Sequence, residues 1–123
     1  MKFFTLDELL NSSNVIDSRD VIILKEKLIL LDEEENKEEL DNIENFLSEI
    51  MDYNSEVEYG TSIISDYYFE DYVKDYIEEI YPELENLPPF IKYNIDWGRV
   101  TNDLKVDYAY VETNNKKYWV SVN

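Results

Sequence analysis

Carboxylates are the reactive side chains that this sequence holds in excess. It has 29 Asp and Glu against 11 Lys and Arg, with no His and no Cys. Two paired carboxylates can act as general acid and base, but among 29 acids some pair lies close together by chance. The missing His and Cys exclude a Ser-His-Asp triad, a thiol nucleophile, a disulfide and a thiolate zinc site. We therefore expect no enzyme and no catalytic residue.

Metal and cofactor sites are not indicated either. A calcium loop places Asp and Asn ligands around a glycine, and neither Gly60 nor Gly98, the two glycines, stands in such a loop. The sequence also lacks a glycine-rich loop that could hold a phosphate. The acidic run at residues 32–35 is typical of an exposed turn. We expect no cofactor and no bound metal; an activity that needs a divalent cation would instead indicate a metal-assisted enzyme.

The formal net charge is −18, and it is confined to the middle of the chain. Residues 32–85 contain 20 acids and the two bases Lys37 and Lys74, whereas nine acids and nine bases lie outside them. Such a charge opposes direct binding to nucleic acid or to an anionic membrane. It suits a protein that is attracted to a basic groove of another protein. The alternative is that the charge only keeps the protein in solution.

The composition predicts one folded domain, because 44% of the residues are hydrophobic and 15% are aromatic. We expect an α+β fold that is mostly helical, with four to five helices and a C-terminal β-hairpin, in a single domain of residues 1–123. Apolar residues at helical spacing and candidate caps predict helices at residues 5–11, 18–31, 37–52, 66–81 and 97–105. Residues 57–64 are expected to be extended or irregular, and residues 88–89 to form a proline loop.

Local signals refine this outline. Candidate N-caps stand before four of the predicted helices: Thr5, Asp17 or Ser18, Ser65 and Asp96. The helix at residues 18–31 is so apolar that we expect it to be buried in the core, and the short connector predicts a hairpin with the next helix. The Asn114-Asn115 pair suits a type I′ turn and predicts the terminal hairpin over residues 107–122.

Two of the predicted helices carry their acids mostly away from their apolar faces. Because tyrosine is common in protein interfaces, Tyr67 and Tyr68 are candidate aromatic contacts beside these acids. The candidate phosphate-mimicking acids are Glu38, Glu39, Asp41, Glu44 and Glu49 on the third helix, Asp66, Glu70, Asp71, Asp75, Glu78 and Glu79 on the fourth, and Glu83 just beyond it.

Charge density decides how many helices such a mimic needs. Duplex DNA carries one charge per ~1.7 Å of its axis. The predicted fourth helix, about 24 Å long, carries six acids, or one charge per roughly 4 Å. One helix therefore has less than half the charge density of a duplex. The hypothesis requires the acidic faces of the third and fourth helices to share one surface.

A family resemblance supports this interpretation. The segment from Asp66 to Glu79, DYYFEDYVKDYIEE, is followed by the Pro88-Pro89 pair, an Ile95-Asp96-Trp97 step and an Asp103-Leu104 pair. This combination resembles the C-terminal domain of the ArdA antirestriction proteins over about residues 60–112. Those proteins are DNA mimics, encoded by phages and mobile elements, that block type I restriction–modification enzymes. The resemblance implies that the acids of residues 66–79 stand in for phosphates.

The resemblance divides the domain into a helical N-terminal part, residues 1–56, and an ArdA-like part, residues 57–123. The chain also looks like small phage proteins that share the Ile-Asp-Trp step and the final hairpin containing Tyr-Trp. We predict an acidic DNA mimic that occupies the groove of a type I restriction–modification complex or a CRISPR effector. A phage or prophage adaptor that binds a protein through its Tyr-rich face is the alternative. No targeting or membrane segment is indicated, so we expect the bacterial cytoplasm, with a homodimer possible.

Overall fold

A central β-sheet organises the structure, which is a computed structural model that describes residues 2–123. The elements follow one another as α1 (Leu6–Leu10), β1 (Val15–Asp17), α2 (Ser18–Asp32), α3 (Lys37–Met51), β2 (Ser62–Ser65), η1 (Asp66–Tyr68), α4 (Phe69–Ile80), η2 (Pro82–Asn86), α5 (Pro89–Lys92), α6 (Trp97–Leu104), η3 (Lys105–Asp107), β3 (Tyr108–Thr113) and β4 (Lys116–Ser121). The α+β class and the C-terminal hairpin, β3–β4, are confirmed.

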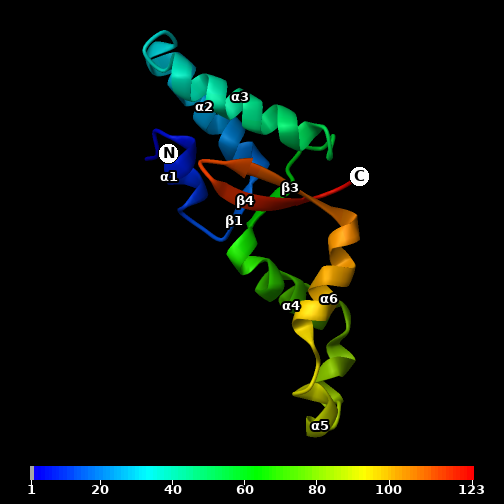
Figure 1. The fold of residues 1–123 in the computed structure, drawn as a ribbon. Coiled ribbons are helices and arrows are strands. Elements are labelled where there is room, and N and C mark those ends of the chain that lie inside the picture. The colour runs from blue at the N-terminus through cyan, green and yellow to red at the C-terminus, as the bar shows by residue number, and fades with distance from the viewer. Residues whose placement is uncertain (1) are drawn as a thin grey trace.

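The sheet within residues 2–123 has four antiparallel strands in the order β1-β2-β4-β3. Its pairings join segments far apart in the chain: Ile64 lies between Val15 and Trp119. Figure 1 shows the α2–α3 hairpin on one side of this sheet and α4 with α6 on the other. The strands β1 and β2 were not predicted as a pair, because three and four residues give too short a pattern.

Alternation along the strands sends neighbouring side chains into two separate hydrophobic cores. Ile63 packs in the first core, with α1, α2 and α3, whereas Ile64 packs in the second core, with α4. Tyr118 and Trp119 divide in the same way: Tyr118 meets Phe46 edge-on at 6.1 Å between ring centroids, and Trp119 belongs to the second core. The sheet is therefore covered by helices on both faces.

The predicted caps and the predicted turn are largely confirmed. Thr5, Asp17 and Asp96 each accept a backbone N–H bond at the start of α1, α2 and α6, at 3.1, 2.8 and 3.1 Å. Asn114 and Asn115 have φ values of 52° and 62°, as a type I′ turn requires. These signals are local, so they act whatever the rest of the chain does.

One local prediction is wrong, and another is wrong in part. Ser65 makes no side-chain cap bond, and a short 3₁₀ helix, η1, precedes α4, which begins at Phe69. Of the two residues predicted as a proline loop, Pro88 does lie outside any helix, but Pro89 occupies the first position of α5. Proline is well suited to that position, where its missing N–H would have no partner within the helix.

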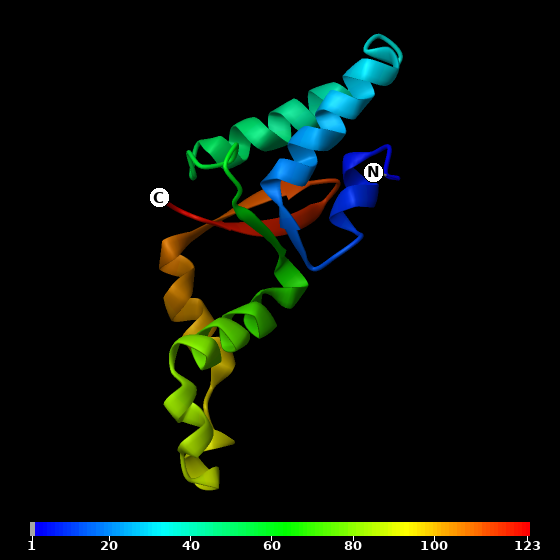
Figure 2. The same ribbon diagram turned by 180° about the vertical axis from the view of Figure 1, so that it is seen from behind.

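The burial expected of α2 is also wrong. Val21, Leu24 and Leu28 are buried, but Leu30 and Leu31 are 87% and 60% exposed. Figures 1 and 2 show why: α2 and α3 form an outer layer, and their connecting end projects beyond the sheet. The predicted α2–α3 hairpin itself is confirmed. No helix within residues 2–123 is long and apolar enough to cross a membrane.

Ser18 links α2 to the segment that leads into β2, and its loss should destabilise the fold. Its buried hydroxyl donates to the Val57 carbonyl at 2.7 Å and accepts the Thr61 N–H at 2.8 Å. We expect Ser18→Ala to lower the free energy of unfolding by about 2 kcal/mol, because both backbone groups lose a partner. Urea unfolding measures the change. Ser13→Ala, at an exposed site, is the control, and equal stability of the two variants would contradict this role.

Candidate functional site

The acids of α4 form a stripe on the side of the helix that faces away from the sheet. Phe69 and Val73, each 1% exposed, fix the buried face. Asp71, Asp75 and Glu78 follow at i, i+4 and i+7, so they share one face, and it is opposite the buried one. Asp71 and Asp75 are exposed and Glu78 is half-buried. We call Asp71, Asp75, Glu78 and the neighbouring exposed Glu79 the α4 stripe.

The acids of the α4 stripe form no ion pair within residues 2–123, although Glu78 lines a small pocket together with Lys74 and Lys92. The ion pairs within residues 2–123 use other acids, for example Lys25 with Glu44 at 3.3 Å and Lys92 with Glu85 at 2.9 Å. Lys74, the base within α4, lies over the Trp97 ring, 6.0 Å from its centroid. The stripe therefore presents negative charge to solvent on a rigid helix.

The charge spacing along α4 is that of a single nucleic-acid strand. The helix has 12 residues and five acids, including Glu70. At a rise of ~1.5 Å per residue it is about 18 Å long, which gives one charge per roughly 3.6 Å. A nucleic-acid strand carries one charge per ~3.4 Å. The exposed Glu83 of η2 extends the series beyond the helix.

The acids of α3 are a weaker candidate surface. Glu38, Asp41 and Glu49 are exposed, but Glu44 is paired with a lysine of α2. Burial raises the pKa of Glu39, and the nearby carboxylates of Asp7, Glu38 and Glu8 add to this increase, against a backbone hydrogen bond from Leu6 that opposes it. Two of the five predicted acids are thus partly engaged within the fold.

The structure does not bring the α3 and α4 acids onto one surface. Helix α3 packs against α1, α2 and β3, whereas α4 packs against β2 and α6. Figures 1 and 2 place the two helices on opposite faces of the sheet. The adjacency that the sequence argument required is therefore wrong. Its cause is the β2 strand, which connects one layer to the other between α3 and α4.

The remaining predicted residues near α4 have structural contacts. Asp66 Oδ1 accepts a hydrogen bond from Trp119 Nε1 at 2.7 Å, which ties η1 to the sheet. Tyr67 is 81% exposed and its hydroxyl donates to Asn14 Oδ1, while Tyr68 is half-buried. Glu70 faces α6, where its carboxylate lies beside Gly98. Tyr67 is therefore the exposed aromatic side chain of this group.

An exposed aromatic tip next to the α4 stripe was not predicted. Phe90 and Tyr93, on and just after α5, are 72% and 77% exposed, and α5 lies at the far end of the α4–α6 lobe (Figure 1). Tyr93 and Glu78 line the same small pocket, of about 80 Å³. The signal was present in the sequence as Pro88-Pro89 followed by aromatic residues, since prolines make a short segment rigid.

Neither a search for metal sites nor comparison with known proteins adds to this description of the site. Across residues 2–123 no three carboxylates are arranged so that they could share a metal ion. The chain matches no protein-family model, no curated protein and no solved structure. The likeness to the ArdA proteins therefore rests on the residues quoted above.

Tyrosines beneath α4 should make the fold sensitive to alkali. Burial raises the pKa of Tyr108 to about 12, and Tyr72, Tyr76 and Asp107 add to this increase. The folded state thus favours the neutral phenol of Tyr108. Its contribution to the free energy of unfolding is complete below about pH 10, the pKa of a tyrosine in the unfolded chain. The contribution is lost as the pH rises toward about 12. We expect Tyr108→Phe to lose less stability over this range than the wild type, measured by urea unfolding at each pH.

The matched control is Tyr59→Phe, because Tyr59 is 81% exposed. It should follow the wild-type dependence on pH. If Tyr108→Phe followed the wild-type curve as well, burial of Tyr108 would not be the source of the alkaline loss.

Proposed function

We propose that this protein inhibits a bacterial defence system by occupying the nucleic-acid groove of a type I restriction–modification complex or a CRISPR effector. It would act in the cytoplasm of the bacterial host. The observation that carries the proposal is the acidic surface of α4: the four acids of the α4 stripe form no ion pair within residues 2–123, and together with Glu70 they have about the charge spacing of one nucleic-acid strand. The ArdA resemblance points to the same surface, because the segment that carries it, residues 66–79, contains all five acids of α4.

The mechanism needs binding and no catalysis. A groove that binds nucleic acid is lined with Lys and Arg that meet phosphates, and a carboxylate can accept the same charge-assisted hydrogen bonds. Because α4 is packed on the sheet through Phe69 and Val73, its backbone is already ordered, and the conformational entropy lost on binding is that of the acidic side chains. The charge of −18 steers the protein toward a basic groove, so association should slow as salt rises.

The contact surface is the α4 lobe and not the pair of helices that the sequence suggested. A single groove meets one face of this molecule, because α3 and α4 lie on opposite sides of the sheet. The α4 acids form no ion pair within residues 2–123, whereas Glu44 of α3 is paired with Lys25. Each helix has one half-buried acid, Glu78 on α4 and Glu39 on α3. The acids of α3 therefore serve as the matched control in the test.

Exposed aromatic side chains favour a second candidate function, an adaptor that binds a protein partner. Phe90, Tyr93 and Tyr67 are 72%, 77% and 81% exposed, and large aromatic residues are frequent hot spots of protein interfaces. In this case the aromatic side chains would provide the binding energy, and the acidic stripe would contribute mainly solubility.

Neutralising the α4 stripe should weaken inhibition. The test variant carries Asp71→Asn, Asp75→Asn, Glu78→Gln and Glu79→Gln, and the assay measures displacement of labelled duplex DNA from a purified type I restriction–modification complex, then from a CRISPR effector. At about 0.5 kcal/mol for each exposed charge contact, four losses amount to about 2 kcal/mol. The concentration for half-displacement should rise about 30-fold.

The control variant, Glu38→Gln, Asp41→Asn, Glu44→Gln and Glu49→Gln, removes four charges from α3 and should displace DNA almost as well as the wild type. Equal losses in both variants would indicate an effect of net charge alone. The adaptor function would be favoured if the α4-stripe variant bound as well as the wild type, whereas a double variant with Phe90→Ala and Tyr93→Ala did not bind. No displacement by the wild type from either complex would contradict the proposed targets.

A further inference from the structure

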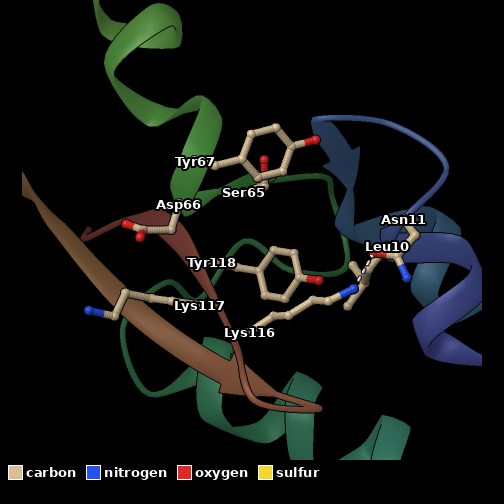
Figure 3. A pocket seen from close by; sticks show the side chains of 8 residues that line it. All are labelled: Leu10, Asn11, Ser65, Asp66, Tyr67, Lys116, Lys117 and Tyr118. Atoms are coloured by element: carbon tan, nitrogen blue, oxygen red, sulfur yellow. Dashed lines mark hydrogen bonds between the residues drawn. The ribbon is translucent and has the colours of Figure 1, made fainter.

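A pocket on the other side of the sheet from α4 has the features of a small-molecule site. It lies between the end of α1, the end of β2 and the start of β4, with a volume of about 290 Å³ (Figure 3). The buried Leu10 and the rings of Tyr67 and Tyr118 provide its apolar walls. Tyr118 and Ser65 are cross-strand partners, so both side chains are on this face.

One buried hydroxyl group among the residues that line this pocket lacks a partner in the structure. Ser65 is 6% exposed, and its Oγ is the buried side-chain polar atom without a hydrogen bond among residues 2–123. Tyr118, which is 3% exposed as a whole residue, lines the pocket beside it. A buried polar group without a partner is unfavourable by an amount comparable to a hydrogen bond. The pocket therefore has unused hydrogen-bonding capacity.

Of the three charged residues that line the pocket, Asp66, Lys116 and Lys117, Lys116 is the one whose side chain runs along it. Lys116 Nζ donates to Asn11 Oδ1 at 2.8 Å and lies 3.8 Å from Asp7 Oδ1, so an ammonium with three donors keeps capacity for a ligand. Figure 3 shows Lys116 reaching along the pocket toward Asn11. The neighbouring Lys117 is turned away, with its Nζ 4.4 Å from the centroid of the Tyr110 ring. Asp66 also points elsewhere, toward Trp119.

We infer that this pocket binds a small aromatic monocarboxylate. Lys116, Ser65 and Tyr118 can all donate hydrogen bonds, and a carboxylate supplies acceptors only, with the one negative charge that an ammonium matches. The tyrosine rings and Leu10 suit an aromatic body. A cavity of about 150 Å³ holds benzene, so the pocket has room for one substituted ring.

Ligand entry involves Tyr67. The Ser65 hydroxyl is closed off from solvent, so a ligand atom reaches it only after a neighbouring side chain moves. Tyr67 lines the pocket, is 81% exposed and is held by a hydrogen bond to Asn14 at the surface. A rotamer change at such a position is common on binding. The site is separate from the α4 stripe and does not depend on the proposed inhibitor function.

Titration with sodium benzoate tests the inference, with the backbone amide resonances of the full chain as the readout. Benzoate should shift the amides of Ser65 and Tyr118 in a saturable way, and equal additions of sodium chloride should not. Lys116→Gln should weaken benzoate binding about tenfold, the value of one charge-assisted hydrogen bond. Lys117→Gln, which removes the same charge one residue away on the opposite face, should change it less than about twofold.

Two further arms separate the alternatives. Benzamide has the same ring without the charge, and if it bound as tightly as benzoate the carboxylate class would be wrong. Ser65→Ala should weaken benzoate binding while leaving the unliganded protein at least as stable as the wild type, because the hydroxyl it removes has no partner. Shifts that do not saturate, or that persist unchanged in Lys116→Gln, would overturn the site.

Discussion

The pleat of the central sheet is the constraint on which the rest of the structure depends. Successive side chains of a strand point to opposite faces, so Ile63 and Ile64 of a four-residue strand belong to two different cores. Tyr118 and Trp119 are divided in the same way on the neighbouring strand. Each face of so small a sheet then needs its own helical cover, and the α2–α3 hairpin and the α4–α6 lobe provide it. The separation of the two acidic helices follows directly from this arrangement.

That separation also explains how the fold tolerates its charge. Like charges repel, and a net charge far from zero destabilises a compact state. At physiological salt this repulsion is screened beyond about 8 Å, and a sheet with a core on each face stands between the two acidic surfaces. A single surface carrying both sets of acids would concentrate the repulsion. The layered fold thus divides the excess negative charge into two smaller groups.

How much of this could be predicted depends on whether a signal is local. Thr5, Asp17 and Asp96 act on backbone groups a few residues away, and Asn114 and Asn115 determine their own turn, so the sequence alone identified these features. The pairing of β1 with β2 joins residues almost fifty positions apart, from Val15 to Ile64, and no local pattern encodes it. The exposure of Leu30 depends on how far the α2–α3 hairpin projects beyond the sheet, and the placement of α3 and α4 depends on β2, which connects the two layers. Neither could be predicted from a local pattern.

The same distinction applies within the candidate site. Helical spacing alone places Asp71, Asp75 and Glu78 on one face, and this part of the prediction needs no tertiary information. Asp66 was assigned to the same group because the fourth helix was predicted to begin there, but its carboxylate accepts the Trp119 indole N–H at 2.7 Å. Trp119 also stacks on Phe69, at 5.0 Å between ring centroids. Asp66 therefore helps to hold α4 against the sheet, so the direction in which the stripe faces depends on an acid that is not part of the stripe.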